Sequence, residues 1–401
     1  MPDVTHVYDT IIVGGGPAGA TAAHDLAQQG RDVMLIDREG RIKPCGGAIP
    51  TKAISEFNIP PSQLKARIGA ARIISPTGKK VSMEIGDIGF VGMVDRDEFD
   101  PFLRDRAEQA GAGRITGTFK SLRYLQDGNV ELTVIRKTDG EEVKLIARTV
   151  IGADGANSAV RRAVFGPNKR PPYVFAYHEI VKSPENPEPQ KFSPDRCDVI
   201  YDGDISPDFY GWVFPHGEHT SIGCGSAHKG HSLKEATRKL RQDAGLEDAV
   251  TIREEGAPLP LKPMRRWDDG KRVVLAGDSA GVVAPSSGEG IYYAMLTGRL
   301  CADAVVQLIE TSRAAALKQP RKRFMKDHGR VFFVLGLLQW IWYSSDKRRE
   351  QFVTMCEDAD VQRLTWESYL NKRLVRKEPM AHMRVMVKDI KQLLGLAPKP
   401  S

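Results

Sequence analysis

Residues 8–37 read YDTIIVGGGPAGATAAHDLAQQGRDVMLID, and the sequence pattern changes three times within them. The apolar run at 9–13 predicts a short buried strand, and the glycines that follow predict a tight turn. Small and apolar residues at 18–29 predict a helix, and residues 32–37 predict a second strand. A strand, a glycine turn, a helix and a second strand in this order predict the βαβ unit of an α/β fold.

The turn carries three glycines at the spacing G-x-G-x-x-G, and each has a mechanical role. Gly14 allows the sharp turn, Gly16 lets the backbone approach a pyrophosphate, and Gly19 lets the helix pack closely on the strand. The helix then presents free N–H groups and its positive dipole end to phosphates. Asp37 ends the second strand about 20 residues after the turn, where a carboxylate can accept hydrogen bonds from ribose hydroxyls. The pattern predicts a dinucleotide site, the alternative being an incidental glycine turn.

The composition favours a two-domain protein without disulfides or metal. The chain has 401 residues, of which 41% are hydrophobic, enough for a sizeable core. Its five cysteines are few, scattered and odd in number, which argues against a disulfide framework and a zinc site. Four histidines outside the βαβ unit show no ligand spacing, so we expect structural roles for them. These cysteines and histidines are Cys45, Cys197, Cys224, Cys301, Cys356, His178, His216, His219 and His228.

The two ends of the chain bear on its location. The first strand begins almost at the N-terminus, which leaves no room for a signal or transit peptide. No run of apolar residues is long enough to span a bilayer as a helix. We therefore expect the protein in a bacterial-type cytoplasm or on the cytoplasmic side of the inner membrane.

The net charge of +7 is concentrated towards the C-terminus. Residues 313–401 hold 19 Lys and Arg against 9 Asp and Glu, a net charge of +10, which leaves −3 for residues 1–312. The region includes the 13-residue run 331–343, which is apolar or aromatic except for Gln339, has basic flanks and is either a buried core helix or an interfacial segment. A basic tail can serve nucleic acid, an anionic membrane or simply a solvated helical face. Of these we expect peripheral membrane contact and no nucleic-acid partner.

The remaining pattern predicts strands and helices in alternation, with turns marked by glycine, proline and aspartate. The expected elements are a short helix at 51–57, a hairpin within 71–85, a helix at 101–110 with Asp97 or Asp100 as cap, an antiparallel meander over 117–150, a helix that carries Val160, Arg161 and Arg162, a β-rich segment over 171–257 with one helix at 232–244, a strand at 271–275 and a helix from 291 to about 310. Arg161 and Arg162 are expected on a solvated helix face, the alternative being that one reaches a phosphate group of a bound nucleotide.

Three motifs follow strands in chain order: GGGPAG at 14–19, GADG at 152–155 and GD at 277–278. This order resembles flavoprotein reductases and hydroxylases with the para-hydroxybenzoate hydroxylase type of fold. The resemblance implies that the first motif holds the FAD pyrophosphate and that the second lies near the phosphates. It further implies that Asp278 binds the ribityl chain and that Arg96 touches FAD.

Within that group the chain resembles the geranylgeranyl reductase family, including its bacteriochlorophyll-pathway branch. The motifs that carry the resemblance are KPCGGAIP at 43–50, YGWVFP at 210–215, GDSA at 277–280 and GEGI at 288–291. The resemblance implies hydrogenation of three double bonds in a geranylgeranyl chain to give phytyl, with NADPH as reductant. The implied substrates are geranylgeranylated bacteriochlorophyllide and geranylgeranyl diphosphate.

An isolated alkene has no carbonyl to withdraw electrons, so hydride addition must be coupled to proton donation. Cys45 or Tyr210 is the expected donor, although Cys45 alone could be an inert loop residue and 210–215 could be plain sheet core. The residues expected to hold the cofactor are Gly14, Gly16, Pro17, Ala18, Gly19, Asp37, Arg38, Cys45, Gly46, Arg96, Asp154, Gly155, Gly277, Asp278, Gly288, Gly290 and Ile291. Those expected to line the prenyl chain are Tyr210, Trp212, Phe214 and Pro215.

The expected architecture is an α/β fold with a Rossmann-like FAD-binding domain, an antiparallel β-sheet substrate domain and a C-terminal helical extension. The expected bounds are 1–165 with 265–312 for the first, 166–264 with 71–94 for the second, and 313–401 for the basic helical region. Two other functions remain open. One is an FAD-dependent aromatic hydroxylase or monooxygenase, and the other is a non-catalytic prenyl-binding protein like the GDP-dissociation inhibitors of prenylated GTPases.

Overall fold

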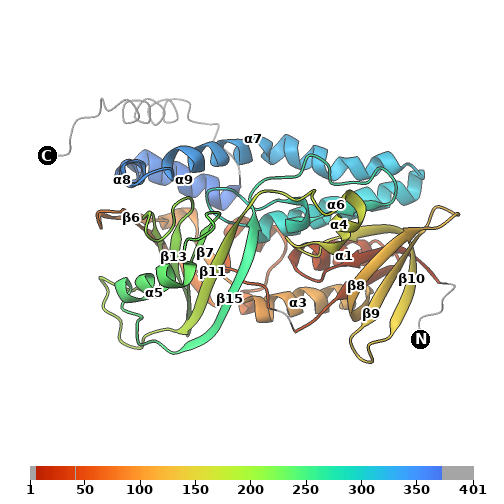
Figure 1. Cartoon of the computed structure of the whole chain (residues 1–401), viewed down its shortest axis with the longest axis horizontal. Coiled ribbons are helices and arrows are strands. Elements are labelled where there is room, and N and C mark those ends of the chain that lie inside the picture. The colour runs from red at the N-terminus through yellow and green to blue at the C-terminus, as the bar shows by residue number, and fades with distance from the viewer. Residues whose placement is uncertain (1–5, 41, 373–401) are drawn as a thin grey trace. The chain divides into compact units, whose positions relative to one another are not determined.

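The structure is a computed structural model that describes residues 6–40 and 42–372. The chain divides into two compact units, each built from three separate segments. Figure 1 colours the chain by residue number, so each segment can be followed along it. Unit 1 comprises Met1–Lys43, Arg96–Val174 and Ala257–Phe332, and unit 2 comprises Pro44–Asp95, Phe175–Gly256 and Phe333–Ser401. Residues 44–70 therefore belong to unit 2, and the C-terminal region is shared between the units. Residues 373–401 of the expected basic region lie outside the described residues.

Unit 1 contains the predicted βαβ unit and a six-stranded sheet. Its elements are β1 (Val7–Val13), α1 (Pro17–Gln28), β2 (Val33–Asp37), α3 (Arg96–Gln109), β8 (Gly113–Tyr124), β9 (Val130–Arg136), β10 (Glu142–Gly152), α4 (Ala159–Phe165), β16 (Val273–Leu275), the 3₁₀ turns η3 (Gly277–Ala280) and η4 (Ala314–Lys318), and α6 (Ile291–Thr311). The strand, helix and strand expected over residues 9–37 are confirmed within two residues at each end.

The sheet of unit 1 combines a parallel part and an antiparallel part. Strands β2, β1, β10 and β16 pair in parallel, and the first residues of β8 extend this part beyond β2. The rest of β8 pairs antiparallel with β9, which pairs antiparallel with the first half of β10. The expected meander is therefore confirmed. Strands β1, β10 and β16 end at the same edge of the parallel part, and the three glycine motifs follow those ends.

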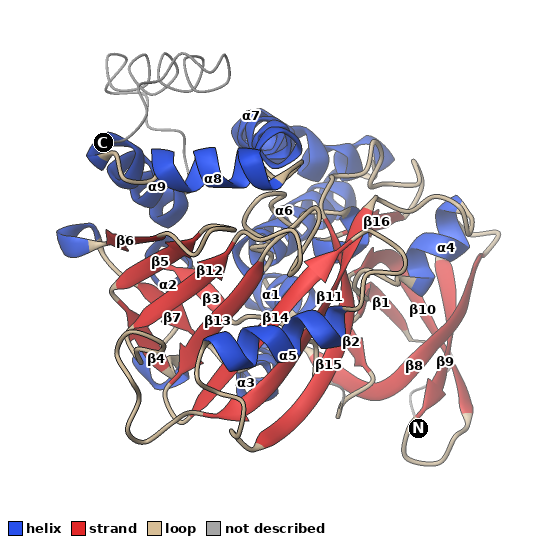
Figure 2. Ribbon diagram, turned by 60° about the vertical axis from the view of Figure 1, so that its left-hand side comes forward, coloured by secondary structure: helices blue, strands red, loops and turns tan. Residues whose placement is uncertain are grey.

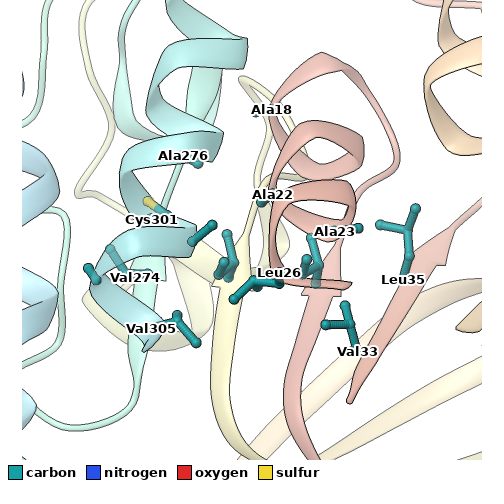
Figure 3. Packing of buried hydrophobic residues seen from close by; sticks show 14 of the residues in the cluster. Ala18, Ala22, Ala23, Leu26, Val33, Leu35, Val274, Ala276, Cys301 and Val305 are labelled. Carbon is teal, nitrogen blue, oxygen red and sulfur yellow. The ribbon is translucent and has the colours of Figure 1, made fainter. Parts of the chain in front are cut away.

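The core of unit 1 lies between α1, α6 and the parallel strands. Figure 3 shows alanines and Leu26 of α1 facing Cys301 and Val305 of α6, with Val33 and Leu35 of β2 on the other side of α1. A Cβ added at Gly298 of α6 would lie 2.1 Å from the carbonyl oxygen of Ala18. The backbones of α1 and α6 are therefore in close contact at Ala18 and Gly298, which only small residues allow.

Unit 2 is mostly β-structure. Its elements are β3 (Ala48–Pro50), α2 (Thr51–Glu56), β4 (Ala66–Ile68), β5 (Ala70–Ile74), β6 (Lys80–Glu84), β7 (Val91–Met93), β11 (Tyr173–Lys182), β12 (Arg196–Ile200), β13 (Gly211–His216), β14 (His219–Ser226), α5 (Leu233–Asp243), β15 (Thr251–Pro260), the 3₁₀ turns η1 (Pro61–Gln63) and η2 (Gly86–Ile88), α8 (Asp346–Met355) and α9 (Ala359–Asn371). Strands β11 and β15 begin or end in unit 1.

The main sheet of unit 2 has seven strands in the order β15-β11-β14-β13-β12-β5-β6. All neighbouring strands whose registers the structure describes are antiparallel except β12 and β5, which run parallel. Helix α5 lies across one face of this sheet (Figure 2), and Ser232 caps it by accepting a hydrogen bond from the backbone N–H of Glu235. A smaller sheet joins β3, β7 and β4. The expected hairpin within 71–85 and the expected helix at 232–244 are confirmed.

Helix α7 (Gln319–Trp342) begins in unit 1 and ends in unit 2. Helix α7 contains most of the apolar run at 331–343. Each of the two alternatives for that run, a buried core helix and an interfacial segment, describes one face of the helix. Trp342 and Tyr343 are buried, and the Tyr343 hydroxyl donates to that of Tyr201 at 3.2 Å. Phe333, Leu337 and Trp340 are instead 72%, 43% and 75% exposed.

Two local predictions are wrong. The helix expected at 101–110 begins at Arg96, so Asp97 and Asp100 lie inside α3 and do not cap it. Pro101 lies inside α3 at its sixth residue, where the helix continues without the hydrogen bond that proline cannot donate, so the proline did not mark the boundary. Arg161 is not on a solvated face but is 3% exposed, and its guanidinium donates to the carbonyl of Ala156 at 2.8 Å. Only its neighbour Arg162 is exposed.

Candidate functional site

The glycine turn of unit 1 is shaped by close backbone contacts. Gly14 has φ of +105°, and a Cβ there would lie 2.4 Å from the carbonyl oxygen of Ala153. A Cβ at Gly19 would lie 1.8 Å from the carbonyl oxygen of Gly14. At Gly16 the nearest atom would be Nη2 of Arg96 at 3.7 Å, so the helix end is open there. No side chain caps α1 at Gly16, which leaves N–H groups available to an anion.

Asp37 is oriented by the same turn. Its Oδ2 accepts a hydrogen bond from the Gly15 N–H at 2.7 Å, and its Oδ1 accepts one from the Glu39 N–H at 2.9 Å. The guanidinium of Arg104 lies 3.6 Å from Oδ1. A carboxylate offers about four acceptor positions, so Asp37 can still receive ribose hydroxyls. Arg38 is exposed, directly after the strand.

Arg96 lies beside the glycine turn in the first turn of α3. It is buried, and its guanidinium donates two hydrogen bonds of 2.6 Å to the carboxylate of Asp100. A bidentate pair holds both side chains in one orientation. Arg96, which the resemblance implies to touch FAD, thus lies next to Gly16. The carboxylate of Asp100 balances the charge of its guanidinium.

The second motif also reaches the glycine turn, but its carboxylate faces its own helix. Asp154 accepts hydrogen bonds from the Ser158 hydroxyl and from two backbone N–H groups at the start of α4, the latter at 2.6 and 3.1 Å. A Cβ at Gly14 would lie 2.8 Å from the Cα of Asp154. Gly155 has φ of +84°, which favours glycine at this turn. Asp154 therefore shapes the loop beside the turn.

The third motif packs on the start of α1. Gly277 has φ of +65°, and its N–H donates to the Thr297 hydroxyl at 2.9 Å. A Cβ at Gly277 would lie 2.9 Å from the Cβ of Ala18. The carboxylate of Asp278 is 5% exposed and hydrogen-bonds the ammonium of Lys43. All three motifs therefore converge around the N-terminus of α1.

The GEGI segment continues this site towards α6. Gly288 has φ of +64°, and a Cβ at Gly290 would lie 3.9 Å from Oδ1 of Asp278. Ile291 is buried at the first position of α6. An uncapped helix end, a carboxylate with acceptor positions still open and a carboxylate paired with a lysine together suit a dinucleotide with a polar linker, so the residues present fit FAD.

In unit 2, residues 45–47 form a short turn that we call the cysteine loop. Cys45 is partly exposed, while the other four cysteines are buried. Its sulfur accepts a weak hydrogen bond from the Gly47 N–H at 3.4 Å. A Cβ at Gly46 would lie 3.1 Å from the ring of Phe214 and 3.9 Å from Nε1 of Trp212. The cysteine loop therefore lies against two aromatic residues of β13.

Tyr210, Trp212 and Pro215 are buried, as expected for sheet core. The rings of Tyr210 and Trp212 are 6.1 Å apart in an edge-to-face arrangement. Burial raises the pKa of the Tyr210 hydroxyl far above its usual value, with Tyr201 and Cys45 adding smaller contributions. Tyr210 and Cys45, far apart in sequence, are thus close enough to interact.

Four features of these sites had no signal in the sequence. Lys43 precedes the cysteine and pairs with Asp278, and Arg104 on α3 reaches Asp37. Asp95 and His216 form a hydrogen-bonded pair at the cysteine loop. Gly15 must also be glycine, because a Cβ there would lie 2.7 Å from Cδ of Arg104. Each depends on a contact between distant segments, which spacing cannot reveal.

Residues 6–40 and 42–372 contain neither a metal site nor a membrane-spanning helix. No group of three or more His, Cys, Asp or Glu side chains in this part is arranged to hold a metal ion. None of its helices has the length and apolar character needed to cross a membrane.

Comparison with known sequences gives full-length relatives. A family model described as "Lycopene cyclase protein" matches residues 9–388. The geranylgeranyl diphosphate reductase of Rhodobacter capsulatus is 54% identical over 98% of both chains. The enzyme of the same name from Synechocystis is 37% identical over 98% of this chain and 100% of its own. The chloroplastic form from Arabidopsis thaliana is 36% identical over 96% and 84%.

Solved structures share the fold at lower identity. The crystal structure of a geranylgeranyl bacteriochlorophyll reductase-like protein from Thermoplasma acidophilum matches with a TM-score of 0.76 and 23% identity, over 98% of this chain and 100% of that one. The flavin-dependent brominase Bmp2 matches with a TM-score of 0.74 and 15% identity, over 97% and 100%. At these identities the likeness is one of fold.

Proposed function

Because the chain belongs to the geranylgeranyl diphosphate reductase family, and to the broader family that the lycopene cyclase model describes, we propose that it is a flavin-dependent reductase of geranylgeranyl chains. The fold is that of FAD-binding flavoproteins. The observation that carries the proposal is the convergence of Gly14, Asp154 and Gly277 on the N-terminus of α1. Three chain segments that meet at one helix end can hold an extended dinucleotide at several points.

The residues of unit 1 would bind and orient the cofactor. The N–H groups at the start of α1 would face the pyrophosphate, and Asp37 would accept from a ribose. The buried Asp278 and its partner Lys43 would face the ribityl chain. When bound and reduced, FAD supplies a hydride.

The residues of unit 2 would supply the proton and shape the prenyl site. Each double bond takes up one hydride and one proton, so the site needs a donor that is protonated at neutral pH. We propose the Cys45 thiol, with Tyr210 as its neighbour. Trp212 and Phe214 would contact the isoprenoid chain, since both lie against the cysteine loop. NADPH is the proposed reductant of the flavin.

The identity of the substrate is also a proposal, and the names of the geranylgeranyl diphosphate reductases support its geranylgeranyl chain. We propose geranylgeranyl-bacteriochlorophyllide, geranylgeranyl diphosphate or both, each reduced at three double bonds to the phytyl level. Anaerobic incubation of the purified holoprotein with NADPH and each substrate, followed by mass analysis, tests this. Products that gain two, four and six hydrogens in succession support the proposal.

The rival functions give different products. Oxygen-dependent NADPH oxidation with gain of an oxygen atom would identify a monooxygenase. A colourless protein that binds the prenyl chain without reducing it would identify a carrier of the dissociation-inhibitor type. Either result would overturn the proposed reductase.

We further propose that the exposed apolar face of α7 contacts an anionic membrane surface. Phe333, Leu337 and Trp340 have the spacing i, i+4 and i+7, which puts them on one side of a helix. Exposed Arg330 precedes them and exposed Lys347 follows them. Basic flanks around an exposed tryptophan suit the headgroup region of an anionic bilayer. The proposed location is therefore the cytoplasmic surface of the inner membrane, where a prenylated substrate resides.

A further inference from the structure

His216 is the last residue of β13 and lies between two hydrogen-bond acceptors. Its Nδ1 is 2.6 Å from Oδ1 of Asp95, and its Nε2 is 3.1 Å from the carbonyl oxygen of Gly46. The His216 ring is 4% exposed. A neutral imidazole has one N–H and can donate to one of these oxygens, while the protonated ring can donate to both. Asp95 and Gly46 therefore hold the ring at both of its nitrogens.

The charges around Asp95 agree with this pairing. Burial is the largest single effect and raises the pKa of Asp95. The hydrogen bond from His216 and the charges of His216, Lys65 and His219 lower this pKa, and together they outweigh burial. The net direction is a pKa below the usual value. Asp95 is therefore an anion at neutral pH, and it fixes the orientation of the His216 ring.

The ring of His216 is in close contact with the cysteine loop. Gly47 has φ of +71°, and a Cβ there would lie 2.4 Å from Cε1 of His216 and 2.4 Å from the carbonyl oxygen of Val94. The Val94 N–H donates to the carbonyl oxygen of Gly47 at 3.0 Å. Phe214 lies against Gly46, and it is two residues from His216 in β13, so the two side chains point to the same face of the strand and both contact the loop.

We infer that His216, oriented by Asp95, is a positioning residue that fixes the cysteine loop and so the place of the Cys45 thiol. The inference rests on the proposed function only for the meaning of Cys45 in the reaction. His216 donates from Nε2 to the carbonyl of Gly46, and this bond prevents the Gly46–Gly47 peptide, one residue beyond Cys45, from rotating. Loss of the bond frees the loop and exposes the thiol.

The reactivity of Cys45 towards a disulfide reagent, 5,5′-dithiobis(2-nitrobenzoate), measures the loop directly. The other four cysteines are buried, and burial raises the pKa of each of their thiols, so they react slowly in the folded holoprotein. Cys45→Ser should therefore abolish the fast phase. The assay needs no substrate, and failure of the reductase assay would leave its result standing.

Two variants separate positioning from general stability. His216→Gln can place its amide N–H near the site of Nε2 and keep the bond to Gly46, while His216→Asn can reach only Asp95. We expect His216→Asn to speed Cys45 labelling about tenfold, the equivalent of one net hydrogen bond, and His216→Gln to label nearly as slowly as the natural protein. Thermal unfolding of both variants is measured in parallel.

The results decide the inference in either direction. Faster labelling in His216→Asn but not in His216→Gln, at similar unfolding temperatures, supports it. Equal labelling rates in both variants would overturn it, because His216 would then affect stability or nothing at the loop. Faster labelling that merely follows a fall in unfolding temperature would overturn it as well.

Discussion

Lys43 and Asp278 are 235 residues apart in the chain, yet the ammonium of Lys43 hydrogen-bonds the buried carboxylate of Asp278 within unit 1. The pair joins the start of the KPCGG segment to the third glycine motif. Lys43 precedes Cys45 by two residues in the sequence, and Asp278 belongs to the turn that packs on α1.

Removal of one partner of this pair should destabilise the protein. Lys43→Met leaves the Asp278 carboxylate buried without its cation, and we expect a loss of about 2 kcal/mol in the free energy of unfolding, less than for a fully buried pair because Lys43 is partly exposed. The double variant Lys43→Met with Asp278→Asn should recover most of this loss. Urea denaturation measures both. The exposed pair Arg323 and Asp303 is the control, and its removal should cost about 0.5 kcal/mol or less.

The proton donor can be identified by comparing Cys45→Ser with Tyr210→Phe. We expect Cys45→Ser to lower kcat by about 100-fold, because a serine hydroxyl is a much weaker acid than a thiol. Tyr210→Phe should have a smaller effect, since burial raises the pKa of its hydroxyl and makes it a poorer donor. Steady-state kinetics under anaerobic conditions measure both. A larger loss in Tyr210→Phe would reverse the assignment.

Stability should fall at alkaline pH. Burial raises the pKa of Tyr201, Tyr210 and Tyr343 well above the usual value of about 10. Above about pH 10 the unfolded chain releases these protons while the folded chain retains them, so the free energy of unfolding decreases as pH rises. Tyr343→Phe should lose about 1 kcal/mol at neutral pH with its hydrogen bond to Tyr201, yet show a shallower alkaline decline.

Urea midpoints between neutral pH and about pH 11 test this tyrosine effect. Tyr173→Phe is the control, because Tyr173 is 37% exposed. An alkaline slope that is the same in Tyr343→Phe and in the natural protein would contradict the prediction.

Membrane contact through α7 should depend on its exposed apolar side chains. A variant with serine at Phe333, Leu337 and Trp340 should bind vesicles of phosphatidylcholine and phosphatidylglycerol about 100-fold more weakly, since roughly half of three large side chains is no longer buried in lipid. Flotation of the holoprotein with these vesicles measures binding, which should also weaken at high salt.

A matched control carries serine at Val250 and Ile252, which are 67% and 50% exposed elsewhere in unit 2. This variant should float like the natural protein. Equal flotation of the α7 variant and this control would contradict the membrane contact. Self-association of the natural protein that is lost in the α7 variant, without vesicle binding, would instead identify a protein interface.

Local patterns predicted the elements whose cause is local. The βαβ unit follows from apolar runs and glycine spacing, and the meander of β8, β9 and β10 follows from its turn residues. The boundary of α3 was missed because a proline usually marks the start of a helix, while Pro101 lies inside α3 at its sixth residue. Arg161 was misplaced because a charged residue in a helix is usually solvated, while here a backbone carbonyl accepts from its buried guanidinium.

The sequence by itself determined the order of the motifs along the chain, the dinucleotide-binding turn and the family resemblance, because each of these depends on residues that are neighbours in sequence. Only the tertiary structure decided that Lys43 meets Asp278, that His216 holds Gly46, and that one face of α7 is exposed. These contacts arise when the parallel and antiparallel sheets bring distant segments together, and the free energy that selects them comes from packing across the whole unit.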